Sequence, residues 1–193
     1  MRRKTLDTLL VAGGGVLFVV LLAVGAVATW GYMYANGTVH DQLAAQKIYF
    51  PPAGSQELAS PKIGPYLNKY AGQQVVNGAQ AEAYANHFIA VHLQGIGGGR
   101  TYSELSALSR KNPANAALKA DVTSVFMGTT LRGLLLEAYA FWMIGQVAFW
   151  VGLSAWVLAF LMLVLVALGI LHSRRVSADA TVLVGKGLTA AAA

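Results

Sequence analysis

The chain has 193 residues, of which 56% are hydrophobic and only 11% are charged. A typical soluble domain carries about 25% charged residues, so this composition excludes an ordinary soluble protein and favours the membrane class. The net charge is +6, and six of the 14 basic residues flank the two apolar blocks at the ends of the chain. The other eight are scattered over residues 35–133 and form no basic stripe, which argues against a nucleic-acid interface. Because the sequence has no cysteine, disulfides and thiolate metal sites are also excluded.

The first apolar block, residues 9–34, contains no charged residue and is long enough to cross a hydrocarbon core of about 30 Å. Basic residues at 2–4 precede it, and three aromatic residues lie within 30–34, where an interfacial belt belongs. We therefore expect a transmembrane helix with residues 1–8 in the cytoplasm. A cleaved signal peptide is the alternative, because residues 26–28 would suit a signal peptidase. The block is longer than the apolar region of about 7–15 residues in such peptides, which favours an anchor.

Residues 35–145 follow as a predicted extracytoplasmic helical domain. A short helix over 38–47 continues from the first span, and the proline-rich stretch 50–65 is predicted to be an extended loop. Asn77 and Gln80 have the spacing of a capping box, which predicts a helix over 78–94.

The glycine run at 95–99 ends this predicted helix, because glycine readily adopts positive φ. Phosphate binding by the run is the less favoured alternative, since the run is followed by Arg100 and Thr101 and not by the Lys and Ser/Thr of a P-loop. Thr101 and Glu104 form a second capping box and predict a helix to about residue 109.

The last predicted helix begins at Asn112-Pro113, with Asn112 as its N-cap, and continues into the second span. Gly128 and Gly133 are the positions where we expect this helix to bend.

The second apolar block, residues 134–171, would be roughly 57 Å long as one helix, far more than the membrane requires. We predict a single span over residues 146–172 and a cytoplasmic tail over 173–193. Two short spans are the alternative, but they would place Arg174 and Arg175 outside, and no turn signal separates them.

Both predicted spans carry small residues at helical spacing, which let another helix approach closely. In the second span these residues are Gly145, Ala148, Gly152, Ala155 and Ala159, and in the first they are Ala12, Gly15, Ala23 and Ala26, with Val19 between them. The stripes are predicted to pack against each other or against another subunit. The simpler alternative is that Gly and Ala are common in membrane helices.

The titratable residues suggest no catalytic or metal centre, so we expect neither an enzyme nor a cofactor. His87 and His92 are five residues apart and do not share a helix face as an i,i+4 pair would. An enzymatic function would require that the fold bring His40, His87 and His92 together with Asp41 or Glu82.

Four aromatic residues of the middle domain are candidates for contact with a partner, since Tyr and Phe are enriched at interfaces. They are Tyr49, Phe50, Tyr66 and Tyr84. The alternative is that they pack the domain's own small core.

Four strings within residues 40–145 resemble small two-span membrane proteins of actinobacteria. They are AQKIYFPP at 45–52, PYL at 65–67, AEAYANHF at 81–88 and TLRGLLL at 130–136. Members of that family are commonly labelled aromatic ring-opening dioxygenases, a label that requires a metal site or its equivalent. Similar proteins accompany the actinobacterial supercomplex of cytochrome bcc and cytochrome aa3 oxidase as accessory subunits, so the resemblance implies those subunits as partners.

Together these observations predict an all-α membrane protein with two transmembrane helices, both termini in the cytoplasm and a helical extracytoplasmic domain between the spans. The expected function is that of a non-catalytic accessory or scaffold subunit of a multisubunit membrane complex. The alternative is a membrane-tethered module that binds a lipid or cell-envelope ligand.

Overall fold

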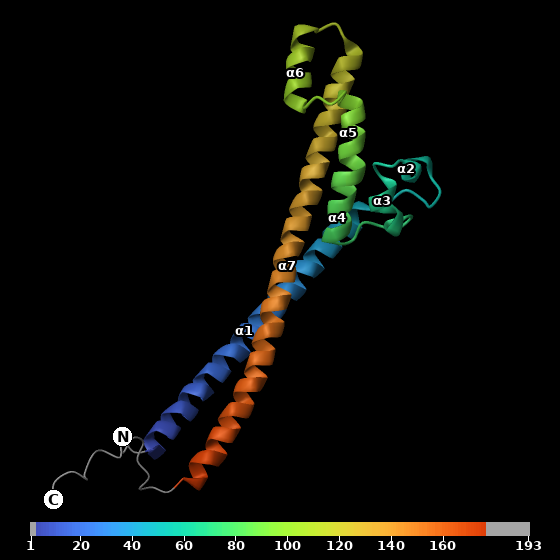
Figure 1. Cartoon of the computed structure of the whole chain (residues 1–193). Helices are drawn as coiled ribbons and strands as arrows, with labels where there is room; N and C mark the ends of the chain where they lie inside the picture. The colour runs from blue at the N-terminus through green and yellow to red at the C-terminus, as the bar shows by residue number, and fades with distance from the viewer. Residues whose placement is uncertain (1–2, 177–193) are drawn as a thin grey trace, which may run out of the picture. The chain divides into compact units, whose positions relative to one another are not determined.

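The computed structural model describes residues 3–176, and these residues are almost entirely helical (Figure 1). They contain one isolated antiparallel bridge, Tyr49 with Gln74, and no extended strand, so the predicted all-α class is confirmed for this part of the chain. The chain divides into two compact units: unit 1 combines the described parts of Met1–Trp30 and Ala148–Ala193, and unit 2 is Gly31–Val147. Residues 177–193 of the predicted tail lie outside the described residues.

Two long helices contribute to both units. Helix α1 (Arg3–Gln46) has 44 residues and α7 (Ala116–Arg175) has 60, and both are long and apolar enough to cross a membrane. Only 6% and 11% of their most apolar stretches are buried, unlike the core helix of a soluble protein. The predicted short helix over 38–47 is the last part of α1, which ends before Lys47 at a left-handed φ of 53°. Helix α7 continues through Gly128 and Gly133 without a break, and the predicted bends at these glycines stay a prediction.

The segment after α1 is more ordered than the predicted loop over 50–65. It contains the short helix α2 (Gln56–Ala59), capped by Ser55, and the start of α3 (Gly64–Leu67). Pro65 occupies the first turn of α3, where its missing N–H costs no hydrogen bond. A 3₁₀ turn, η1 (Asn68–Tyr70), then leads the chain back beside the end of α1.

The predicted helix over 78–94 is present and longer, and it consists of three parts: α4 (Gly78–Tyr84), η2 (Ala85–Ile89) and α5 (Ala90–Gly97). Asn77 caps it as predicted, accepting a hydrogen bond from the Gln80 N–H. The Gln80 side chain accepts a hydrogen bond from the backbone N–H of Val76 at 2.9 Å. Val76 is one residue before the N-cap, whereas a capping box would use the N–H of Asn77 itself. The middle part, η2, is a wide π-helical turn in which the Ala90 N–H bonds to the Ala85 carbonyl.

The glycine run ends α5 as predicted, since Gly98 is left-handed with φ 55° and the Gly99 N–H bonds to the Gln94 carbonyl at 2.9 Å. Helix α6 (Tyr102–Lys111) begins with the predicted capping box of Thr101 and Glu104, in which both reciprocal hydrogen bonds are present.

The predicted start of α7 is wrong. Asn112 ends α6, because its side chain donates to the Leu108 carbonyl at 3.0 Å. The N-cap interaction comes from Asn115 instead, whose Oδ1 accepts from the Leu118 N–H at 2.9 Å.

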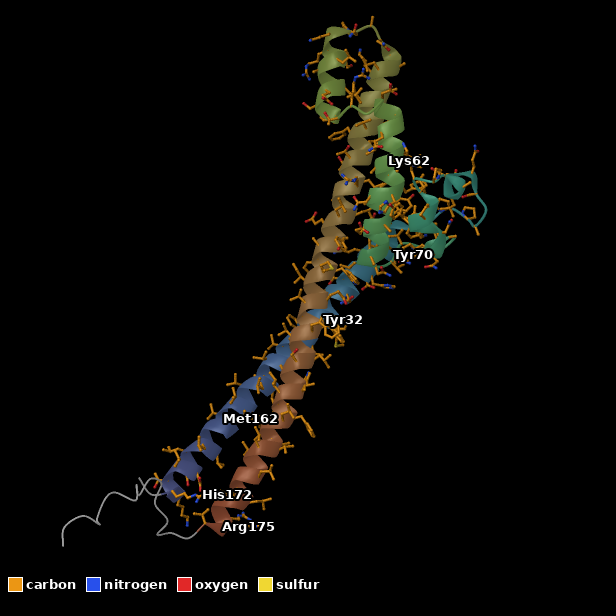
Figure 2. All side chains as sticks on the ribbon, in the orientation of Figure 1. Tyr32, Lys62, Tyr70, Met162, His172 and Arg175 are labelled. Carbon is orange, nitrogen blue, oxygen red and sulfur yellow. The ribbon has the colours of Figure 1, made fainter. Side chains whose placement is uncertain are left out.

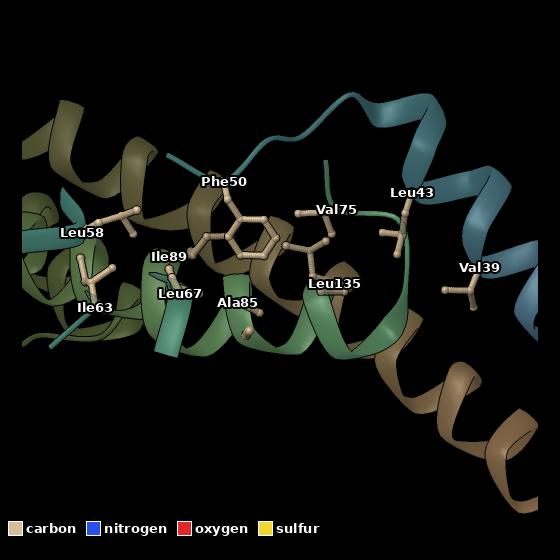
Figure 3. Close-up of a cluster of buried hydrophobic side chains, with 12 residues drawn as sticks. Val39, Leu43, Phe50, Leu58, Ile63, Leu67, Val75, Ala85, Ile89 and Leu135 are labelled. Carbon is tan, nitrogen blue, oxygen red and sulfur yellow. The ribbon is translucent and has the colours of Figure 1, made fainter. Parts of the chain in front are cut away.

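The core of unit 2 lies where α1, the segment 48–75 with α2 and α3, the helix α4 to α5, and α7 meet (Figure 3). Helices α4 and α5 lie antiparallel along α7: a Cβ at Gly78 would collide with Trp142, and one at Gly128 would lie 2.5 Å from Leu93. These glycines allow the backbones to approach closely. Leu135 of α7 is 1% exposed within the resulting cluster.

Candidate interaction surfaces

The four aromatic candidates occupy two different environments. Phe50 is 2% exposed and packs against Tyr84 at 5.4 Å between ring centroids, so both contribute to the core of unit 2. Burial of the Tyr84 ring raises the pKa of its phenol, as expected when the charged form loses solvent. Tyr49 and Tyr66 are 56% and 49% exposed, which leaves these two on the surface.

The histidines near this surface are engaged by aromatic neighbours. The His87 ring stacks on Tyr66 with centroids 3.6 Å apart and planes within 3°. The His92 ring lies 4.3 Å from Phe88, and its Nδ1 forms a 2.8 Å hydrogen bond with the Phe88 carbonyl. Within residues 3–176 no three His, Cys, Asp or Glu side chains lie together in a way that could hold a metal ion.

A polar link connects the wide turn to α7. The Arg132 guanidinium donates to Asn86 Oδ1 at 2.7 Å, and Asn86 Nδ2 donates to Glu82 Oε1 at the same distance. The link spans 46 residues of sequence between Asn86 and Arg132. It therefore fixes the register of the helix pair by a side-chain contact that sequence spacing did not reveal.

An exposed apolar strip follows α7 through unit 2. Its members at seven-residue spacing are Met127, Leu134 and Phe141, with exposed fractions of 58%, 54% and 38%. We call these three residues the α7 strip. The strip was not predicted from the sequence, although its spacing of seven residues is a readable signal of one helix face.

A surface groove of about 350 Å³ adjoins the α7 strip in unit 2. Leu134 and Phe141 form one wall, and Val39 and Leu43 of α1 contribute to the other. Glu137 and polar side chains of α1 complete the lining, so the groove combines apolar walls with one carboxylate. This arrangement suits an apolar helix face that carries a hydrogen-bond donor.

The small residues of α7 lie against α1 within each unit. In unit 2, a Cβ on Gly145 would meet the Ala35 side chain at 3.0 Å. In unit 1, a Cβ on Gly152 would meet Thr29 and Ala28 at 3.3 and 3.4 Å. The other members are Ala148, which is half-buried, and Ala155 and Ala159, which are buried.

The predicted stripe of α1 lies differently. Ala12, Ala23 and Ala26 are exposed and Gly15 is half-buried, while α1 approaches α7 through other small residues. Gly25 faces the Trp156 ring, and Gly14 faces Val166, each with a closest hypothetical Cβ distance of 2.9 Å. This exposure leaves open contact with another subunit and the simpler alternative that small residues are common in membrane helices.

Two interhelical hydrogen bonds accompany these contacts. Within unit 1, Trp156 Nε1 donates to Thr29 Oγ1 at 3.1 Å, and within unit 2, Gln146 Nε2 donates to Asn36 Oδ1 at 3.3 Å. Polar side chains on otherwise apolar helices are common sites of helix association in membranes.

No family model matches the sequence, and comparison with curated proteins and with solved structures found no match.

Proposed function

We propose that this protein is a non-catalytic accessory or scaffold subunit of a multisubunit membrane complex. Helices α1 and α7 each cross the membrane once, both termini are cytoplasmic, and unit 2 is extracytoplasmic. The length and composition of the two helices support their membrane placement. The basic residues before the first apolar block and after the second support the orientation.

The observation that carries the subunit role is the apolar strip on α7. At about 1.5 Å per residue, a helix of 60 residues is roughly 90 Å long, about three times the hydrocarbon thickness. With the carboxyl-terminal part of α7 in the membrane, Met127 and Leu134 lie beyond the lipid. Large exposed side chains in a row outside lipid mark a surface that a partner covers.

The groove indicates the chemistry of that partner. Its apolar walls would accept the side chains of a partner helix, and Glu137 would accept a hydrogen bond from a donor on that helix. The exposed residues Ala12, Ala23 and Ala26 provide a matching surface for close helix packing inside the membrane.

The resemblance of residues 40–145 to actinobacterial two-span proteins supports a respiratory context for this proposal. In that context the partners are subunits of cytochrome bcc and cytochrome aa3 oxidase. The protein itself contributes contact surfaces and no electron carrier.

Affinity purification in mild detergent tests the proposal, with mass spectrometry and a haem absorbance spectrum as readouts. The tagged protein is expected to retain its partner subunits in near-stoichiometric amounts. The double variant Leu134→Lys with Phe141→Lys should lose them, because it puts two charges on the α7 strip. Ala140→Lys is the control, since Ala140 is exposed on α7 about 120° from Leu134.

If the double variant keeps the same partners as the unchanged protein, the α7 strip is not the docking surface. A protein that purifies alone, without haem, would contradict the accessory role and favour the tethered binding module.

A further inference from the structure

Two adjoining grooves lie between α1 and α7 in unit 1, near the amino end of α1. The first has a volume of about 420 Å³ and a fully apolar set of lining side chains, including Leu17 and Met162. The second, of about 320 Å³, includes Asp7 and His172 in its lining. Both grooves share Leu10, Val11 and Gly169, so they form a single path from an apolar end to a polar end.

Positive charge gathers at the polar end of this path. The Arg3 guanidinium donates to His172 Nε2 at 3.4 Å, which makes that ring nitrogen an acceptor. Lys4 follows Arg3 in the sequence, Arg174 and Arg175 follow His172 closely, and all three side chains are exposed. Figure 2 shows Met162, His172 and Arg175 in succession along α7.

Asp7 lines the same end and is only half-buried, but its Oδ2 is covered and has no hydrogen-bond partner in the described part of the chain. A carboxylate oxygen in this state calls for a donor that the described residues do not supply. The path therefore offers apolar walls, several cations and one unfilled acceptor.

We infer that this path binds an anionic glycerophospholipid of the inner leaflet whose headgroup carries a hydroxyl, as phosphatidylglycerol does. One acyl chain fills the apolar groove, Arg3 and its neighbouring cations hold the phosphate, and the headgroup hydroxyl donates to Asp7. Free phosphate would satisfy only the cations and leave the apolar groove empty. The inference rests on the proposed membrane placement of α1 and α7, since basic groups between helices at the cytoplasmic face are typical lipid headgroup sites.

Native mass spectrometry of the full chain in detergent tests this inference with three lipids of equal chain length. The expected result is retention of phosphatidylglycerol above both phosphatidylcholine, which is neutral, and phosphatidylmethanol, which has the same charge but lacks the headgroup hydroxyl. Arg3→Gln should reduce phosphatidylglycerol retention about fivefold, the factor expected for one cation at the lipid surface. Arg110→Gln is the control, because it removes the same charge from an exposed residue of α6 in unit 2.

A second pair of variants tests the acyl groove. Gly13 lines the groove, and a Cβ there would meet nothing within 4 Å, so Gly13→Leu starts a large side chain at an open position of the groove. A Cβ on Gly15 would also meet nothing within 4 Å, but Gly15 lies outside the groove lining, which makes Gly15→Leu the control. Gly13→Leu should lower phosphatidylglycerol retention to the level of phosphatidylcholine, and Gly15→Leu should leave it unchanged.

Equal retention of phosphatidylglycerol and phosphatidylcholine by the unchanged protein would overturn the inference, and so would a Gly13→Leu variant that binds normally. Equal retention of phosphatidylmethanol and phosphatidylglycerol would remove Asp7 from the site. Recovery of the protein without detergent would contradict the membrane placement itself. Lipid selectivity is measured on the isolated chain and does not depend on partner subunits. A failure of the proposed subunit role would therefore leave the lipid result unchanged.

Discussion

Leu134 and Leu135 are neighbours on α7 with opposite environments, and truncating each in turn gives a matched test of the fold. Leu135 is 1% exposed in the core of unit 2, whereas Leu134 is 54% exposed on the α7 strip. Leu135→Ala should cost about 2–5 kcal/mol, from the lost burial and the cavity that remains. Leu134→Ala should stay within about 0.5 kcal/mol, as is usual for surface positions.

Hydrogen exchange of the full chain in detergent measures this difference directly. A loss of about 2–5 kcal/mol corresponds to exchange that is roughly 30- to 4,000-fold faster in the amides that open with the core. The effect of Leu135→Ala should be seen in peptides from α4, η2 and α5, which pack against this part of α7. Peptides from residues 9–29 serve as an internal control, because they belong to unit 1. Similar exchange for Leu134→Ala and Leu135→Ala would refute the assigned core.

Gly78→Ala should destabilise unit 2 by about 1–3 kcal/mol, because the added methyl group collides with the start of the Trp142 side chain. Gly95→Ala is the control: its Cβ would meet nothing within 4 Å, and thermal unfolding should show no loss of stability. Hydrogen bonds from the Thr101 backbone N–H and hydroxyl hold the pKa of Glu104 below its usual range, with a smaller contribution from Arg100. The capping box should therefore stabilise α6 fully above about pH 4.3 and lose this effect as the pH falls through the lowered pKa of Glu104. Glu104→Gln should remove the pH dependence of hydrogen exchange in α6.

Features that depend on neighbouring residues could be predicted from the sequence. The capping box of Thr101 and Glu104 is one, because its donors and acceptors lie within four residues. The cap of α7 could not be assigned in the same way. Asn112 and Asn115 are both suitable residues, and the choice depends on Asn112 being engaged by the Leu108 carbonyl at the end of α6.

The packing face of α1 shows a different limit. A membrane helix is apolar on all sides, so hydrophobic periodicity does not distinguish the face that meets another helix. Small residues occur all around α1, and the close approaches to α7 at Gly14 and Gly25 depend on the bulky side chains opposite them. The α7 strip has a readable period, but only its exposure in the folded chain separates it from a core face.

The wide turn η2 has a consequence for chain length. Five residues at four-residue spacing in the α4–α5 segment are all buried or half-buried: Ala81, Ala85, Ile89, Leu93 and Gly97. In a regular helix this spacing would drift by about 160° over the segment, and one extra residue taken up by the turn reduces the drift to about 60°. Deleting one residue within 85–89 would thus leave a regular helix whose two ends keep their faces toward α7. The same deletion within α5 would rotate everything after it by about 100°, so length variation in this segment should be confined to the turn.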